Sequence, residues 1–393
     1  MNNLLGAYKS IAGHGVVQKT AYAMYRMLHH FLLNKNIVDT NGMCLAPRQP
    51  FLPSARGDNF GRSVVCVSGF GHSGSGAVVD LLSEYKGVEV IGYVDKNGSL
   101  RKDTDFEFNL LRATGGLFSM ESQYQGNGDF LRGDAIRLFL RLVAYLYLEI
   151  GGRFNDDFLT ATRDFLDKLL VPSPNVRLGS RLGGYNGRNH LSVCGTAGAR
   201  LIWGDCGIER IFSIRQLSVP EYRLFAHEYV SKVLNIITSE KLIVLDQAVS
   251  DCTGDMDKYR DYLGPVKCIA VYRDPRDSYA TGRILNECWM ASDPKGYVEI
   301  LRQALRPYWK LKDKDFLLLR FEDLVKNYDH TVLEIERFLG LSSDAHAFKK
   351  SGFDPEISAK NVGIHKSYGD QESVSIVAEM MPECLYTPRL DER

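Results

Sequence analysis

Two stretches of the sequence hold residues whose types and spacing suit the binding of an anion. The first covers residues 68–76, reads Ser-Gly-Phe-Gly-His-Ser-Gly-Ser-Gly, and holds four glycines and three serines. The apolar run at 64–67 predicts a buried strand before it, and the spacing at 77–85 predicts a helix after it. A strand that turns through such a loop into a helix directs backbone N–H groups and the positive end of the helix dipole at one point. That point suits a phosphate or a sulfate group.

The glycine loop fits more than one kind of nucleotide site. The P-loop of a kinase or ATPase carries Lys and then Ser or Thr after its last glycine, whereas Ser-Gly follows Gly74 here. Gly69, Gly71 and Gly74 do fit the pattern Gly-x-Gly-x-x-Gly, and Asp95 closes the next apolar run at 88–94. An acidic residue about 20 positions beyond such glycines binds the ribose of a dinucleotide. These residues therefore allow the interpretation that the chain is a Rossmann-type NAD(P)-dependent oxidoreductase.

The second stretch covers residues 269–281 and reads Ile-Ala-Val-Tyr-Arg-Asp-Pro-Arg-Asp-Ser-Tyr-Ala-Thr. A strand predicted at 266–272 ends at Arg273, and a helix predicted at 277–288 carries Thr281. Arg273 is then expected at the carboxyl end of a parallel strand, on the same sheet edge as the glycine loop, where open α/β sheets bind ligands. A guanidinium fork with a hydroxyl group suits a terminal phosphate. In the alternative interpretation, the charged residues of this turn pair with one another: Arg273, Asp274, Arg276 and Asp277.

The remaining pattern predicts an α/β protein with a mainly parallel sheet and helices on both faces. Further strands are predicted at 241–245 and 316–321. Helices are predicted at 134–150, 155–170 and 218–238, the last opening with a Ser-Val-Pro-Glu capping box. We expect residues 1–60 to form a helical appendage and linker and 61–393 to form the main domain. Residues 100–217 break the alternation, which predicts an inserted helical subdomain.

Composition narrows the classes of partner. The 393 residues include 48 basic and 48 acidic ones, and this zero net charge argues against a general nucleic-acid binder. Eight scattered cysteines without a Cys-x-x-Cys pair indicate a reducing compartment and no metal site. The apolar run at 135–150 contains two arginines and falls short of the roughly 20 residues of a membrane span. We expect a cytoplasmic protein, with residues 17–33 allowing at most weak contact with a membrane surface.

Two later stretches complete a resemblance to a known family. Residues 318–324 read Leu-Leu-Arg-Phe-Glu-Asp-Leu, with Phe-Leu-Gly-Leu at 338–341, and residues 358–366 read Ser-Ala-Lys-Asn-Val-Gly-Ile-His-Lys. In this order, with the two stretches above, they resemble the sulfotransferases that use 3′-phosphoadenosine-5′-phosphosulfate (PAPS). The resemblance covers about 64–95 and 241–385. It implies a sulfotransferase fold related to that of the P-loop NTPases.

The resemblance also implies roles for individual residues. The glycine loop would hold the 5′-phosphosulfate through Gly71, Ser73, Gly74, Ser75 and Gly76. The 3′-phosphate would contact Arg273, Thr281, Lys360 and Asn361. PAPS would be the co-substrate, no metal is expected, and the sulfuryl group would pass to a hydroxyl acceptor. The size of the insertion favours a bulky acceptor such as a saccharide or a glycan precursor.

The sequence departs from the family at cationic positions. His72 stands where the family has Lys or Arg at the leaving group, Gln247 stands where it has a central lysine, and Gly76 replaces a threonine. Protonated His72 would assist the leaving group, because a nearby anion favours the charged imidazole. The first candidate for the general base is Asp95, followed by Asp246, His190 and Glu107. A non-catalytic relative that binds PAPS or its product, adenosine 3′,5′-bisphosphate (PAP), is the second alternative.

Overall fold

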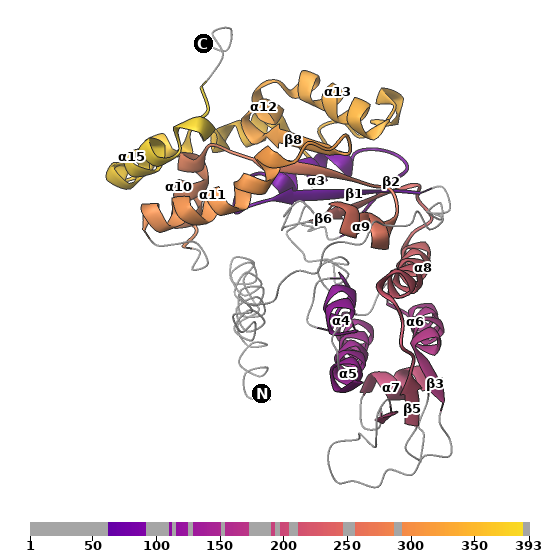
Figure 1. Cartoon of the computed structure of the whole chain (residues 1–393). Helices are drawn as coiled ribbons and strands as arrows, with labels where there is room; N and C mark the ends of the chain where they lie inside the picture. Colours follow the sequence, from indigo (N-terminus) through magenta and orange to yellow (C-terminus); the bar gives the residue numbers. More distant parts are fainter. Residues whose placement is uncertain are drawn as a thin grey trace, which may run out of the picture.

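A five-stranded parallel sheet forms the centre of the molecule (Figure 1). The structure is a computed structural model and describes residues 62–91, 110–111, 115–124, 129–150, 154–172, 190–192, 197–203, 211–246, 256–286 and 293–387. The strands are ordered β2-β6-β1-β7-β8, and every neighbouring pair runs parallel. Their bounds are β1 Ser63–Gly69, β2 Val88–Ile91, β6 Leu242–Asp246, β7 Val266–Tyr272 and β8 Phe316–Arg320.

The apolar runs of the strands supply two hydrophobic cores, one on each face of the sheet. Along β1, Val65 and Val67 join one core, whereas Val64 and Cys66 join the other. Successive side chains of a strand point to opposite faces, so a strand covered on both sides must be apolar throughout. One face is covered by α3 Ser75–Leu82, α12 Phe321–Lys326 and α13 Tyr328–Leu339; the other by α8 Val219–Ile237, α9 Met256–Leu263 and α11 Pro294–Lys310. The predicted fold class is confirmed.

Local sequence signals set where two of the helices begin. The predicted capping box opens α8: the amide of Ser218 donates to Glu221 Oε2 at 2.8 Å, and Ser218 Oγ accepts from the Glu221 amide at 3.4 Å. Helix α10, Pro275–Ile284, begins two residues before its predicted start at 277 and ends before 288. Its earlier start follows from the Asp274 side chain, which caps the helix by accepting from the Arg276 amide at 2.9 Å.

The chain between β2 and β6 contains helices and a second, small sheet. The helices before α8 are α4 Leu117–Tyr124, α5 Asp129–Tyr145, α6 Asp156–Leu169 and α7 Ala197–Trp203. Contrary to the helix predicted at 134–150, α5 stops at Tyr145 and a π-helical turn, Leu146–Ile150, follows it. The antiparallel sheet has the order β3-β5-β4, with bounds Leu170–Pro172, Ile211–Ile214 and His190–Ser192. Strands of three or four residues are too short to show an alternation in the sequence, and none of the three was predicted.

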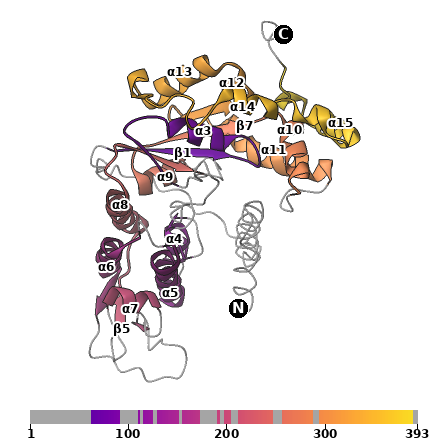
Figure 2. The same ribbon diagram turned by 180° about the vertical axis from the view of Figure 1, so that it is seen from behind.

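These elements extend away from the large sheet, with the small sheet at the far end (Figures 1 and 2). The proposed division of the chain, with 100–217 as an insertion, stays a prediction. The predicted appendage at 1–60, including 17–33, lies outside the described residues. Among the residues that the structure describes, no helix has the length and apolar character needed to span a membrane.

A buried carboxylate attaches the C-terminal part of the chain to the sheet. Glu84, just beyond α3, is fully buried and accepts hydrogen bonds from the amides of Gly352 (2.8 Å) and Phe353 (2.7 Å). It also contacts His346 Nε2 at 2.6 Å and accepts from the Lys350 amide at 3.1 Å. Residues 346–353 are thereby held beside the end of α3. The elements that follow them are α14 Pro355–Ser358, 3-10 turns Ala359–Asn361 and Ile364–Ser367, α15 Gln371–Met380 and 3-10 turn Pro382–Cys384.

Candidate functional site

The candidate site lies where the strand order of the large sheet reverses. Counted in chain order, its strands are arranged 2-3-1-4-5. The connection that leaves β1 runs through α3 toward β2, and the one that leaves β7 runs toward β8 on the opposite side. In open α/β sheets, ligands bind outside the carboxyl ends of the strands at such a reversal. The glycine loop follows β1 and Arg273 follows β7, so both stretches singled out in the sequence lie at this point.

Close packing explains the glycines of the loop. A Cβ atom at Gly69 would lie 2.0 Å from Ser73 Oγ, and one at Gly74 would lie 2.2 Å from the Phe321 ring. Gly74 also has a φ of 88°, and His72 has a φ of 53°. Both angles lie in the left-handed region, which costs a residue with a Cβ atom about 1–2 kcal/mol. The loop is therefore a tightly wound segment that places the buried Ser73 side chain over Gly69.

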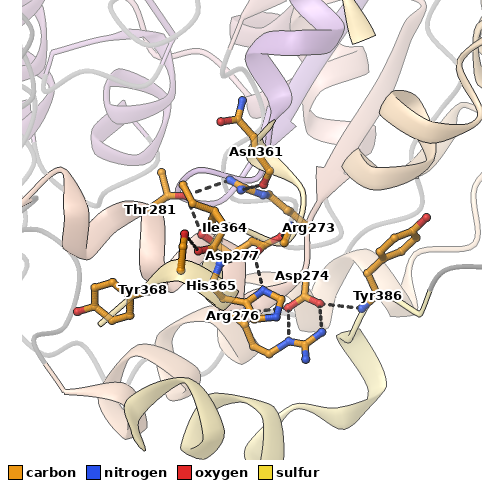
Figure 3. A network of polar contacts seen from close by, with 12 residues as sticks. Arg273, Asp274, Arg276, Asp277, Thr281, Asn361, Ile364, His365, Tyr368 and Tyr386 are labelled. Carbon is orange, nitrogen blue, oxygen red and sulfur yellow. Dashed lines mark hydrogen bonds and ion pairs between the residues drawn. The ribbon is translucent and has the colours of Figure 1, made fainter. Parts of the chain in front are cut away.

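Arg273 connects three segments that are far apart in the sequence (Figure 3). Its Nη1 donates to the carbonyl oxygen of His72 at 3.1 Å and to Thr281 Oγ1 at 3.3 Å. Its Nη2 donates to the carbonyl oxygen of Asn361. The side chain is 6% exposed, and its guanidinium lies over the Phe321 ring, 5.3 Å from the centroid. The glycine loop, α10 and the 359–361 turn thus meet at one buried cation.

The polar atoms of this site that are buried without a hydrogen-bond partner among the described residues include one carboxyl oxygen, Glu322 Oε2, and two donors. The donors are Ser73 Oγ and Arg273 Nε. Leaving a buried donor unpaired costs about 1–3 kcal/mol, so such atoms in a native structure indicate a missing partner. Both atoms are able to donate to the oxygen of an anion.

The charged residues of the turn after β7 divide into two sets. Arg276 pairs with Asp274, Nη2 to Oδ2 at 2.6 Å, as the alternative interpretation of this stretch expected. Arg273 and Asp277 do not pair in this way: Asp277 instead accepts from the amides of Gly363 at 2.7 Å and His365 at 3.0 Å. The turn therefore combines an internal ion pair with several hydrogen bonds to the 361–365 segment.

The remaining candidate residues differ in their burial and in their position in the fold. Ser75 is buried at the start of α3 and Gly76 is exposed beside it, whereas Lys360 is exposed on the turn that carries Asn361. Asp246 ends β6, where Val67 of β1 is its neighbour in register. His190 begins β4 of the small sheet. Three of the residues discussed above lie outside the described ranges: Asp95, Glu107 and Gln247.

Glu322 is a residue of this site to which the sequence assigned no role. It lies fully buried at the start of α12, and its Oε1 accepts from the Asp274 amide at 2.9 Å. Burial raises the pKa of Glu322 to about 7, and the nearby Asp274 carboxylate adds to the rise. Burial likewise lowers the pKa of Arg273, against the charges of Asp277 and Glu322. The signal in the sequence was the Arg-Phe-Glu-Asp-Leu stretch, which places an acid directly after a strand.

No family model matches the chain, and no curated protein matches its sequence. Among solved structures, the chain is similar to the sulfotransferase domain from the Synechococcus PCC 7002 olefin synthase, with 14% identity, a TM-score of 0.36 and coverage of 83% of this chain and 95% of that one. It is also similar to sulfotransferase STF9 from Mycobacterium avium, with 10% identity, a TM-score of 0.35 and coverage of 94% and 83%. A third similar structure is sulfotransferase STF1 from Mycobacterium tuberculosis H37Rv, with 13% identity, a TM-score of 0.31 and coverage of 77% and 76%.

The raised pKa of Glu322 predicts a dependence of stability on pH. With a pKa of about 7 against an ordinary 4.5, the folded protein keeps a proton that the unfolded chain releases. The resulting stabilisation is fully present below about pH 4.5 and is lost as the pH rises through about 7. Relative to Glu322→Gln, the free energy of unfolding of the wild type should fall by on the order of 3 kcal/mol between about pH 5 and 8. Urea unfolding of both proteins measures this difference, and a difference that does not vary with pH would contradict the prediction.

The packing of Phe321 on the glycine loop predicts a large cost for Gly74→Ala. Gly340→Ala is the matched control, because Gly340 also has a left-handed backbone, φ 75°, but has no atom within 4 Å of the added methyl position. In Gly340→Ala the free energy of unfolding should fall only by the cost of the left-handed backbone, about 1–2 kcal/mol. In Gly74→Ala it should fall by about 1–3 kcal/mol more, since the Phe321 ring must move. Equal losses in chemical denaturation would show that the ring contact does not constrain the loop.

Proposed function

We propose that the chain is a sulfotransferase that transfers a sulfuryl group from PAPS to a hydroxyl acceptor. The observation that carries the proposal is the convergence on Arg273. The stretches that resemble the family's donor-binding segments stand 201 and 88 positions from Arg273, yet each contributes a carbonyl oxygen to its guanidinium. Segments so distant in the sequence are expected to meet if they bind one ligand together.

The residues present fit the two anionic ends of the donor. Near the 3′-phosphate we place Arg273, Thr281, Lys360 and Asn361, and the orphaned Nε atom of Arg273 is a donor for that group. The 5′-phosphosulfate would lie in the glycine loop at the N-terminus of α3, with the orphaned hydroxyl of Ser73 as a donor. The residues assigned to this end are Gly71, Ser73, Gly74, Ser75 and Gly76. This assignment uses no metal ion.

The transfer consists of one displacement at sulfur. A bond forms between the acceptor oxygen and sulfur as the bond from sulfur to the bridging oxygen breaks, and PAP leaves. The acceptor hydroxyl loses its proton to a base, for which we propose Asp95 or Asp246. His72 would neutralise the charge that develops on the bridging oxygen, because such transfers depend mostly on positioning and on charge neutralisation. Residues 100–217 would shape the acceptor site, and their size favours a saccharide or glycan precursor.

The strand order argues against the oxidoreductase alternative. In the usual dinucleotide-binding order, 3-2-1-4-5-6, the first two strands are direct neighbours. Here β6 lies between β1 and β2 and pairs with both. The non-catalytic alternative is favoured by the replacement of two cations by His72 and Gln247. The non-catalytic relative and the enzyme would both bind PAP, so a measurement of PAPS turnover is needed to distinguish them.

Binding of PAP tests the donor site. A ligand at a hundredfold excess over its Kd stabilises the folded state by about 2.7 kcal/mol, which raises the melting temperature. We expect a rise with PAP for the wild type, none with NAD(H) or NADP(H), and a loss of the rise in Arg273→Lys, which keeps the charge but not the fork. Arg283→Ala, which removes an exposed arginine of α10, is the control and should retain the rise. A rise with a dinucleotide alone would contradict the proposal.

Substitutions of His72 test its role at the leaving group. His72→Asn tolerates the left-handed backbone but carries no charge, and it should lower kcat for the hydrolysis of PAPS by about a hundredfold with little change in PAP affinity. His72→Lys should retain or raise kcat, because it restores a cation. If kcat is unchanged in His72→Asn, His72 has no role in the reaction. If the wild type binds PAP but does not turn over PAPS, the chain is the non-catalytic relative.

A further inference from the structure

Asp277 is an acid in a site that we assign to an anion. It stands in the first turn of α10, four residues after Arg273 and four before Thr281, and is 1% exposed. A carboxylate close to a phosphate raises the electrostatic cost of binding it. The proposed donor site makes no use of this carboxylate, so its position calls for another explanation.

Both carboxylate oxygens of Asp277 are occupied by one short segment. Oδ2 accepts from the Gly363 amide at 2.7 Å, and Oδ1 accepts from the His365 amide at 3.0 Å and from His365 Nδ1 (Figure 3). His365 is itself buried, with 8% exposure. Burial by itself would raise the pKa of Asp277, but these hydrogen bonds hold it below its ordinary value. The Asp277 carboxylate is thus ionised, and hydrogen bonds from the segment stabilise its negative charge.

The same segment carries the carbonyl oxygen that Arg273 binds. Asn361 lies two residues before Gly363, and Gly363 has a left-handed backbone, φ 81°, at which the chain turns. Arg273 and Asp277 therefore hold the segment at two points, one on each side of this turn. If only one of these two attachments formed, the segment would have to become ordered when the ligand binds.

We propose that Asp277 and His365 form a latch that positions residues 360–363 against Arg273 and so preorganises the 3′-phosphate end of the donor site. The inference rests on the proposed function, because it names what the latch prepares. Asp277 and His365 are positioning residues, since neither is assigned a contact with the donor. Apparent affinity falls with the fraction of protein in the competent arrangement, so an open latch weakens binding and leaves the chemistry unchanged.

Two conservative substitutions of His365 isolate the hydrogen bond. In His365→Asn the side-chain amide nitrogen takes the place of Nδ1, whereas in His365→Gln it takes the place of Nε2. His365→Ala removes the donor altogether. We would measure PAP binding to the full chain by calorimetry, KM and kcat for PAPS hydrolysis, and hydrogen exchange of the peptide that covers 360–366, after confirming by circular dichroism that each variant is folded.

The latch predicts a split between binding and chemistry. His365→Ala and His365→Gln should bind PAP at least about tenfold more weakly, with a matching rise in KM, little change in kcat and faster exchange at 360–366. His365→Asn should stay close to the wild type in every measurement. Unchanged affinity in His365→Ala, or equal losses in His365→Ala and His365→Asn, would overturn the latch alone. Failure of the wild type to bind PAP would instead overturn the proposed function and the latch with it.

Discussion

The burial of one guanidinium group, that of Arg273, is the constraint on which the rest of the site depends. A buried cation is costly unless hydrogen bonds and opposite charges surround it. Arg273 is 6% exposed, and two carbonyl oxygens and a hydroxyl oxygen accept from its Nη atoms. Those acceptors come from the glycine loop, from α10 and from the 359–361 turn. The need to satisfy this cation therefore couples segments that the sequence separates.

The negative charge of each acidic residue around Arg273 is compensated in a different way. Asp274 pairs with Arg276, Asp277 accepts hydrogen bonds from the 363–365 segment, and Glu322 is partly protonated near neutral pH because its pKa is raised to about 7. Left ionised and unpaired, the three carboxylates would oppose an anionic ligand. With each one compensated, the guanidinium is the group at this point that remains able to attract an anion. Charge balance within the turn is thus part of the case for an anion site.

Backbone packing sets the other half of the site. Gly69 leaves room for Ser73 Oγ, and Gly74 leaves room for the Phe321 ring, which also lies under Arg273. Phe321 follows β8 directly, so the ring joins the carboxyl end of a third strand to the loop and to the cation. Such a contact makes the loop conformation depend on the whole sheet edge. A substitution in the Arg-Phe-Glu-Asp-Leu stretch should therefore affect the loop after β1.

The sequence by itself determined the elements whose signals are local. The strand at 266–272 was predicted with its observed bounds, and Ser218 and Glu221 open α8, because apolar runs and capping residues act within a few positions. Tertiary structure alone decided the strand order, the three short strands of the small sheet and the attachment of Asp277 to a segment 86–88 positions away. The physical reason is that these features depend on which surfaces meet, and on which buried polar groups must find partners, once the chain is folded.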